Sequence, residues 1–262
     1  MLINAGSGHS AGPLDMADIF ATLYFHVLNV DPEKPYKDDR DYVLLSCGHI
    51  CPVWYATLAH RGYFPQKELL TLRKLGTRLQ GHPHIHALPG IENTSGPLGQ
   101  GLSQGAGIAL GLKMQGKTSQ FVYVIGSDAE FQEGQVWEAA MFASKNQLGN
   151  LIWIIDRNNI QIDGYTESVM PIEPLREKLE AFGWYTLEVD GHNHQEIISA
   201  CEHAKAVFNR PTVIVAHTIA GKGVDFMEYK YEWHGKVPSP EEAKEALNEL
   251  RTLGGKIVSE HQ

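Results

Sequence analysis

The sequence predicts an α/β protein with a doubly wound, mostly parallel sheet that is covered by helices on both faces. Short apolar runs of strand length alternate with longer stretches whose apolar residues recur at helical spacing. The connections between them are short, and no internal repeat or low-complexity linker interrupts the pattern. Such alternation is typical of parallel sheets. A chain of 262 residues can bury the core of one large domain, so we predict a single domain over residues 1–262.

The individual elements follow from apolar periodicity and from capping residues. The predicted strands are residues 42–46, 121–125, 151–155, 185–189 and 212–216. The predicted helices are residues 16–28 with Asp15 as the N-cap, 65–76 between Pro65 and Gly76, a small-residue helix at 103–111, a helix from 136 to about 149, 174–182, 195–208, and a charged terminal helix at 240–253. Glycines in the small-residue helix cost about 1 kcal/mol each relative to alanine, so we expect another helix or a ligand to approach it closely.

Composition excludes several classes of partner and compartment. The net charge of −9 and the pI near 5.8 argue against binding to nucleic acid or to an anionic membrane. No apolar run approaches the roughly 20 residues that span a bilayer, and the N-terminus lacks the pattern of a secretory signal. Cys47 and Cys51 flank His49, but no second ligand pair has a matching spacing, so we interpret the cysteines as buried free thiols. We expect a cytoplasmic protein.

Two polar turns lie at the centre of the pattern. Residues 121–164 form a strand, a helix and a second strand, and a right-handed parallel unit places both polar turns at the same carboxyl edge of the sheet. Asp128 and Asn158 should therefore converge. A carboxylate, an amide and a nearby backbone carbonyl are hard oxygen ligands suited to Mg²⁺ or Ca²⁺, and magnesium often adds substrate phosphates to its shell. These turns predict a metal-bound diphosphate ligand, and the competing interpretation is a Rossmann-like crossover with ordinary polar turns.

Histidines mark four other loop segments. They are His9 in the glycine-rich loop 6–13, His49 directly after the first predicted strand, the group His82, His84 and His86, and His234 near the C-terminus. A loose tail, a structural histidine and a zinc site are the competing interpretations for these segments. Zinc is disfavoured at residues 82–86 because no cysteine or carboxylate lies close by in the sequence to complete the ligand set. A histidine that follows a strand lies where open α/β sheets bind ligands.

Taken together, these motifs resemble those of the transketolase family, in the family's order and over nearly the whole chain. The matching segments are Ser7-Gly8-His9, Gly48-His49, Gly81-His82-Pro83, SGPLGQG at 95–101, Asp128 with Glu133-Gly134 and Asn158, and Trp233-His234-Gly235-Lys236. Two segments depart from the family pattern. Ser10 replaces a proline, and Ser127-Asp128-Ala129 stands where the family has Gly-Asp-Gly. Ala129 can still offer its N–H to a diphosphate if its φ is negative.

The resemblance implies a thiamine-diphosphate-binding fold and a cofactor site. Mg²⁺, with Ca²⁺ as a possible substitute, would be held by Asp128, Asn158 and the carbonyl of Ile160. The remaining cofactor contacts implied by the family are His49 and His234 on the diphosphate and thiazolium side, Gly96 and Leu98 on the thiamine unit, and the Ala129 N–H on the diphosphate. His9, His82 and His234 would be the catalytic residues that contact substrate oxygens and transfer protons, a role that suits imidazole near neutral pH.

The resemblance also implies a function. The chain would be the diphosphate-binding subunit of a split transketolase, which transfers a two-carbon ketol unit between sugar phosphates together with a separate pyrimidine-binding subunit. It would self-associate as a homodimer or assemble as an α2β2 complex. The alternatives are another thiamine-diphosphate enzyme subunit, similar to deoxyxylulose-phosphate synthase or to the α chain of a 2-oxo-acid dehydrogenase, and a non-catalytic cofactor-binding homologue. The histidine set and the Trp-His-Gly-Lys segment argue against the first alternative.

Overall fold

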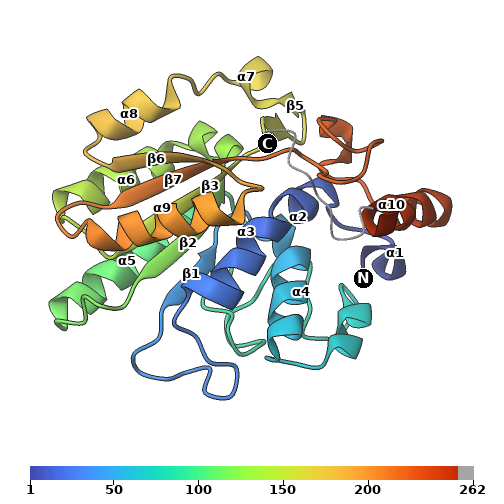
Figure 1. The fold of residues 1–262 in the computed structure, drawn as a ribbon, viewed down its shortest axis with the longest axis horizontal. Helices are drawn as coiled ribbons and strands as arrows, with labels where there is room; N and C mark the ends of the chain where they lie inside the picture. The colour runs from blue at the N-terminus through green and yellow to red at the C-terminus, as the bar shows by residue number, and fades with distance from the viewer. Residues whose placement is uncertain (253–262) are drawn as a thin grey trace.

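A five-stranded parallel sheet forms the centre of the computed structural model, which describes residues 1–252 (Figure 1). The strands are β1 Tyr42–Leu45, β2 Val122–Ser127, β3 Leu151–Arg157, β6 Tyr185–Asp190 and β7 Thr212–His217. Their order across the sheet is β1-β2-β3-β7-β6, and all neighbouring strands are parallel. An antiparallel hairpin of β4 Ile160–Gln161 and β5 Gly164–Tyr165 follows β3. The predicted fold class and the predicted strands of the large sheet are confirmed.

Alternate side chains of the strands enter two different cores, because successive residues of a strand point to opposite faces. In β2, Tyr123 and Ile125 belong to one core, whereas Val122 and Val124 belong to the other. Helices α3, α4 and α9 contribute to the first core, and α5, α6 and α8 contribute to the second. The sheet is therefore covered on both faces, as the apolar strand runs predict.

Helices and shorter helical turns lie between the strands and at both ends of the described chain. Their bounds are α1 Leu2–Ala5, α2 Ala11–Asp15, α3 Ala17–Thr22, α4 Cys51–Arg61, α5 Gln100–Met114, α6 Gly134–Lys145, α7 Thr166–Val169, α8 Leu175–Ala181, α9 His194–Ala206 and α10 Pro240–Thr252. Shorter helical turns are η1 Leu23–Val27, η2 Gly48–Ile50, η3 Gln66–Thr71, η4 Asp128–Gln132 and η5 Tyr231–Trp233. Residues 253–262 of the predicted domain, including the last residue of its predicted terminal helix, lie outside the described residues. Within residues 1–252, every helix is too short or too polar to traverse a lipid bilayer.

Helix α4 has no counterpart among the predicted elements. It is buried along almost its whole length, with Trp54, Tyr55 and Leu58 in the first core. A helix that is buried all round has no polar face, so its sequence lacks the periodicity that identifies surface helices. Periodicity alone cannot find such a helix.

The prediction of a helix over residues 65–76 is wrong. Only Gln66–Thr71 is helical, as a 3₁₀ segment, and Arg73 then adopts a φ of 60°. The backbone N–H of Arg73 donates to the carbonyl of Leu79 at 2.8 Å. Leu70 and Leu75 are exposed, so an α-helix here would have no continuous apolar face to bury.

The predicted N-cap role of Asp15 is also wrong. The expected helix over 16–28 is divided into α3 and the π-turn η1, and α2 precedes it, so the helical region begins earlier, at Ala11. Asp15 is the last residue of α2, and it is completely buried. Its carboxylate accepts a hydrogen bond from the amide of Asn158 at 3.0 Å. A long-range polar contact has replaced the expected local cap.

Candidate active site

A cavity of about 420 Å³ lies at the carboxyl edge of the sheet, next to the ends of β1, β2 and β3. Its lining residues are His9, His49, His82, Gly96, Leu98, Ser127, Ala129, Gln132, Glu133, Gln161, Ile162, Asp163 and His234. All predicted catalytic histidines and all predicted thiamine-contacting residues are in this set. The predicted metal ligands Asp128, Asn158 and Ile160 do not line the cavity. They are buried, at sequence positions close to residues that do line it.

Three of the histidines form a tight cluster. The ring centroids of His9 and His49 are 4.8 Å apart, those of His49 and His234 are 4.9 Å apart, and those of His9 and His234 are 5.5 Å apart. Burial lowers the pKa of His9 and of His234 to about 4, and it holds the pKa of His49 well below its usual value. Burial, followed by the nearby Arg73, lowers the pKa of His82. The cluster is therefore uncharged near pH 7, so each ring can donate one hydrogen bond and accept another.

A close backbone approach brings the predicted cofactor turn to the end of β1. A Cβ atom at Gly48 would lie 2.5 Å from Ser95 Oγ and 3.1 Å from the backbone nitrogen of Gly96. Any larger residue at position 48 would push the 95–99 turn away from the cavity. Glycine at this position is therefore required for the 95–99 turn to lie beside His49.

Glu130 joins three segments of the site by hydrogen bonds, and it was not predicted as a site residue. Its carboxylate accepts hydrogen bonds from Ser46 Oγ at 2.6 Å, from the Gly99 N–H at 2.7 Å and from the Ser127 N–H at 3.0 Å. Burial raises the pKa of Glu130, and these hydrogen bonds oppose that shift. The Ser127-x-x-Glu130 spacing is that of a capping box, which is the signal that would have identified this residue.

The Asp128 carboxylate has one satisfied oxygen and one orphaned oxygen. Oδ2 accepts from Arg157 Nη1 at 2.8 Å and from the Asn159 N–H at 2.9 Å. Oδ1 is buried and has no hydrogen-bond partner. A buried carboxylate oxygen without a partner is costly unless a cation or a donor meets it. The chemistry of Asp128 therefore fits a metal ligand.

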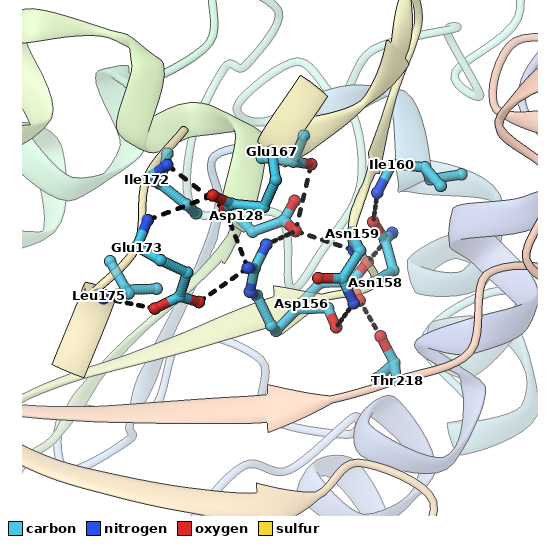
Figure 2. Close-up of polar contacts among 12 residues, drawn as sticks. Asp128, Asp156, Asn158, Asn159, Ile160, Glu167, Ile172, Glu173, Leu175 and Thr218 are labelled. Carbon is cyan, nitrogen blue, oxygen red and sulfur yellow. Dashed lines mark hydrogen bonds and ion pairs between the residues drawn. The ribbon is translucent and has the colours of Figure 1, made fainter. Parts of the chain in front are cut away.

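Asn158 is held in place by two buried carboxylates, of which Figure 2 shows Asp156. Its amide nitrogen donates to Asp15 and to Asp156, each at 3.0 Å, and its Oδ1 accepts from the Ile160 N–H at 3.0 Å. A carbonyl oxygen has two lone pairs, so Oδ1 retains one for a further partner. Burial raises the pKa of Asp15 well above its usual value and that of Asp156 to about 7.

The predicted convergence of the two polar turns is confirmed at the level of the backbone. Ser127 pairs with Asp156 in the β2–β3 register, and Asn159 bonds directly to Asp128. Within residues 1–252, no three His, Cys, Asp or Glu side chains form a group that could hold a metal. The predicted ligand set is of another kind, because it combines one carboxylate with an amide and a carbonyl oxygen.

Three polar residues that line the cavity belong to none of the motif segments quoted from the sequence. They are Gln132, Gln161 and Asp163. They follow β2 and β3 at the ligand-binding edge of the sheet, and that position is the signal that indicates them. Gln132 also donates to the carbonyl of Met170 at 2.8 Å, so it joins the cavity to the segment that carries α7.

Comparisons with known proteins identify the family. Residues 1–254 match the family described as "Transketolase, thiamine diphosphate binding domain". The chain is 44% identical over 249 residues to a 6-deoxy-6-sulfo-D-fructose transketolase subunit of Clostridium sp. (strain MSTE9), covering 95% of this chain and 90% of that protein. It is 38% identical over 261 residues to a subunit of the apulose-4-phosphate transketolase of Phocaeicola vulgatus, covering 100% of this chain and 92% of that protein.

Solved structures agree with this assignment. A transketolase from Pichia stipitis in complex with a sugar phosphate superposes with a TM-score of 0.89 at 33% identity over 94% of this chain. The transketolase of Campylobacter jejuni gives the same TM-score and identity over 97%. This chain spans only 38% and 40% of the lengths of those two proteins. The chain belongs to the transketolase family, as a subunit that carries the family's thiamine-diphosphate-binding domain.

Proposed function

We propose that this chain is the diphosphate-binding subunit of a split transketolase and works with a separate pyrimidine-binding subunit. Together they would transfer a two-carbon ketol unit from a ketose phosphate to an aldose phosphate. The observation that carries the proposal is that one cavity is lined by His9, His49, His82 and His234 and by residues of the 95–99 turn. Relatives that match this chain over about nine-tenths of their own length are named as transketolase subunits, which supports the split arrangement.

The roles of the chain's residues follow from this proposal. When bound, thiamine diphosphate supplies a nucleophilic thiazolium carbon that can break the bond between C2 and C3 of a ketose. His49 and His234 would hydrogen-bond the cofactor, and Gly96 with Leu98 would contact its thiamine unit. His9, His82 and His234 would bind substrate oxygens. The lowered pKa values of these three histidines keep their rings uncharged near pH 7, so each ring can hydrogen-bond a substrate hydroxyl through its unprotonated nitrogen.

We further propose that a divalent cation joins the diphosphate to the chain. The Asp128 carboxylate, the Asn158 side-chain carbonyl and the backbone carbonyl of Ile160 would be its ligands. The orphaned Oδ1 of Asp128 supports this assignment. Replacing Asp128 with Ala should abolish Mg²⁺-dependent cofactor binding, as measured by calorimetry, while circular dichroism shows a folded chain. Undiminished Mg²⁺-dependent affinity in this variant would reject the site.

The wider context of the subunit is also a proposal. The names of the relatives specify sugars that carry a phosphate or a sulfonate, so the substrates would be sugars with a terminal anionic group. Residues 1–262 would act as one domain. The assembly would most simply be an α2β2 heterotetramer in the cytoplasm.

The decisive experiment is a ketol-transfer assay of the purified chain with saturating thiamine diphosphate and Mg²⁺, without and then with the candidate partner subunit. We expect no turnover by the chain alone and turnover when the partner is added. Turnover by the isolated chain that persists through rigorous purification would overturn the split-enzyme proposal. Cofactor binding without turnover, even with a partner that itself binds the chain, would instead indicate a non-catalytic homologue.

A further inference from the structure

The guanidinium of Arg157 lies between three carboxylates at the end of β3, directly before Asn158. Its side chain is 6% exposed. Nη1 donates to Asp128 Oδ2 at 2.8 Å, and Nη2 donates to Glu167 Oε1 at 3.0 Å and to Glu173 Oε1 at 2.8 Å. We propose that Arg157 is a positioning residue that makes Asp128 a one-oxygen metal ligand and thereby sets the preference of the site for Mg²⁺ over Ca²⁺. This inference rests on the proposed metal site.

The two oxygens of Asp128 are made unequal by their surroundings. Oδ2 accepts from Arg157 and from the Asn159 N–H, and Thr166 Oγ1 lies 3.4 Å away as a third, longer donor. Oδ1 accepts from no group and is buried. Because these donors occupy the lone pairs of Oδ2, a cation can approach the carboxylate only through Oδ1. Asp128 is thus arranged for monodentate coordination.

Monodentate coordination discriminates between the two cations. Mg²⁺ requires near-ideal octahedral geometry at about 2.0–2.1 Å and is commonly bound through one or two carboxylates. Ca²⁺ takes about six to eight oxygens at longer distances and accepts bidentate carboxylates. Because Arg157 occupies Oδ2, Asp128 offers a cation one oxygen. One oxygen suits Mg²⁺, whereas Ca²⁺ loses a possible second oxygen ligand.

Two of the carboxylates that bind the guanidinium, Glu167 and Glu173, are themselves hydrogen-bonded to the backbone (Figure 2). Glu167 Oε1 accepts from the Ile172 N–H at 3.3 Å, and Glu173 Oε2 accepts from the Leu175 N–H at 2.7 Å. Both carboxylates are therefore anchored to the backbone of the segment between α7 and α8. A planar guanidinium can donate to three carboxylates in fixed directions, whereas a lysine ammonium acts as a mobile point charge. The arrangement fixes the orientation of Asp128 rather than only neutralising its charge.

The test is the ratio of the dissociation constants for Ca²⁺ and Mg²⁺. Each cation is titrated by calorimetry into the full chain saturated with thiamine diphosphate, for wild type and for Arg157→Gln. Loss of an outer-shell partner typically weakens metal binding by about 10- to 100-fold, and we expect this loss for Mg²⁺. The dissociation constant for Ca²⁺ should rise much less, because loss of the Arg157 bond leaves Oδ2 able to act as a second ligand. The ratio of the Ca²⁺ to the Mg²⁺ dissociation constant should therefore fall by roughly tenfold.

The controls separate positioning from stability. Glu173→Gln removes one anchor of Arg157 but keeps its bond to Asp128, so it should lower the melting temperature and leave most of the ratio intact. If Arg157→Gln does not fold, Arg157→Lys replaces it and should shift the ratio in the same direction by a smaller factor. Equal loss of Mg²⁺ and Ca²⁺ affinity in a folded variant would overturn the inference alone. Absence of any thiamine-diphosphate-dependent cation binding by the wild type would overturn the metal site as well.

Discussion

Individual residues of the site are held by partners that lie far away in the sequence. Glu130 accepts from Ser46 and Gly99, and Asn158 donates to Asp15. Each of these carboxylates is buried, so each would destabilise the fold if its partner were removed. The clustered rings of His9, His49 and His234 differ, because they pack against one another. Single substitutions should therefore affect the two groups differently.

Ala129 replaces a family glycine without straining the turn. Within residues 1–252, the non-glycine residues with positive φ are Arg73, His86, Gln147, Asn159 and Tyr229. The prediction that Ala129 has a negative φ is therefore confirmed. We expect Ala129→Gly to leave thiamine-diphosphate affinity within about twofold and to lower stability by no more than about 1 kcal/mol, measured by calorimetry and urea unfolding. A large gain in affinity would show that the natural turn is compromised.

Burial of His234 predicts a dependence of stability on pH. Its pKa is lowered from 6.5 to about 4. Between these values the unfolded chain binds more protons than the folded chain, so the folded state loses stability as the pH falls from 6.5 towards 4. Relative to His234→Gln, wild type should lose about 2 kcal/mol of unfolding free energy between pH 7.5 and pH 5.

The measurement for His234 is urea unfolding of both proteins at each pH. Asp15 and Asp156 have raised pKa values and respond in the opposite direction. They are present in wild type and variant alike, so their contributions cancel in the difference. A pH-independent difference between wild type and His234→Gln would contradict the prediction.

At the scale of elements, helix α5 shows why a helix contains so many small residues. Its buried face packs on β1 and β2, where a Cβ at Gly101 would lie 2.4 Å from Ser46 Cβ and a Cβ at Gly105 would lie 2.3 Å from Val124 Cγ2. At Gly107 and Gly111, an added Cβ would meet nothing within 4 Å. The close approach at Gly101 and Gly105 is therefore made by the protein's own sheet, and not by the helix or ligand expected from the sequence.

This asymmetry predicts opposite effects of the same substitution. Gly105→Ala should destabilise the chain by about 1–3 kcal/mol through overpacking. Gly107→Ala should stabilise it by about 0.5–1 kcal/mol, because alanine restricts the unfolded chain and favours the helix. The free energy of unfolding in urea measures both. Similar effects at the two positions would mean that α5 does not pack on β2 as described.

At the scale of the whole molecule, apolar side chains are exposed beside the cavity. Ile162, Tyr165, Val169 and Met170 are each more than two-fifths exposed. Ile162 lines the cavity, and Met170 is tied to the cavity residue Gln132. Apolar residues around the mouth of a site are typical of a surface that a partner covers. Under the proposed function, the pyrimidine-binding subunit would cover them.

Met170→Asp should therefore weaken association with the partner by about tenfold or more, while the chain's own melting temperature stays the same. Phe208→Asp is the matched control. Phe208 is 86% exposed and lies between α9 and β7, at the opposite end of the sheet from the cavity. Surface plasmon resonance with the immobilised partner measures both variants. Equal weakening by the two substitutions would reject this surface as the partner site.

Local patterns made two features of the fold predictable. These are the positions of the strands along the chain and the edge of the sheet at which the cavity lies. Apolar runs such as residues 151–155 indicate buried strands, and the right-handed crossover then places the turns after them on one edge. The histidine and glycine motifs could be matched to a family for the same reason, since each is a short continuous segment. Helix α4 was missed because burial on all sides leaves no periodic signal. Residues 65–76 were mispredicted because Arg73 adopts a left-handed conformation that the local sequence does not indicate.

Tertiary structure alone decided how the buried polar groups of the site are paired. Asp15 looks like a helix cap in the sequence, yet it meets Asn158. Arg157 looks like one residue of a polar loop, yet it withholds one oxygen of Asp128. Such contacts join segments 29 to 143 positions apart. Local propensity carries no information about them, because they form only where packing brings distant segments together and excludes water from their polar groups.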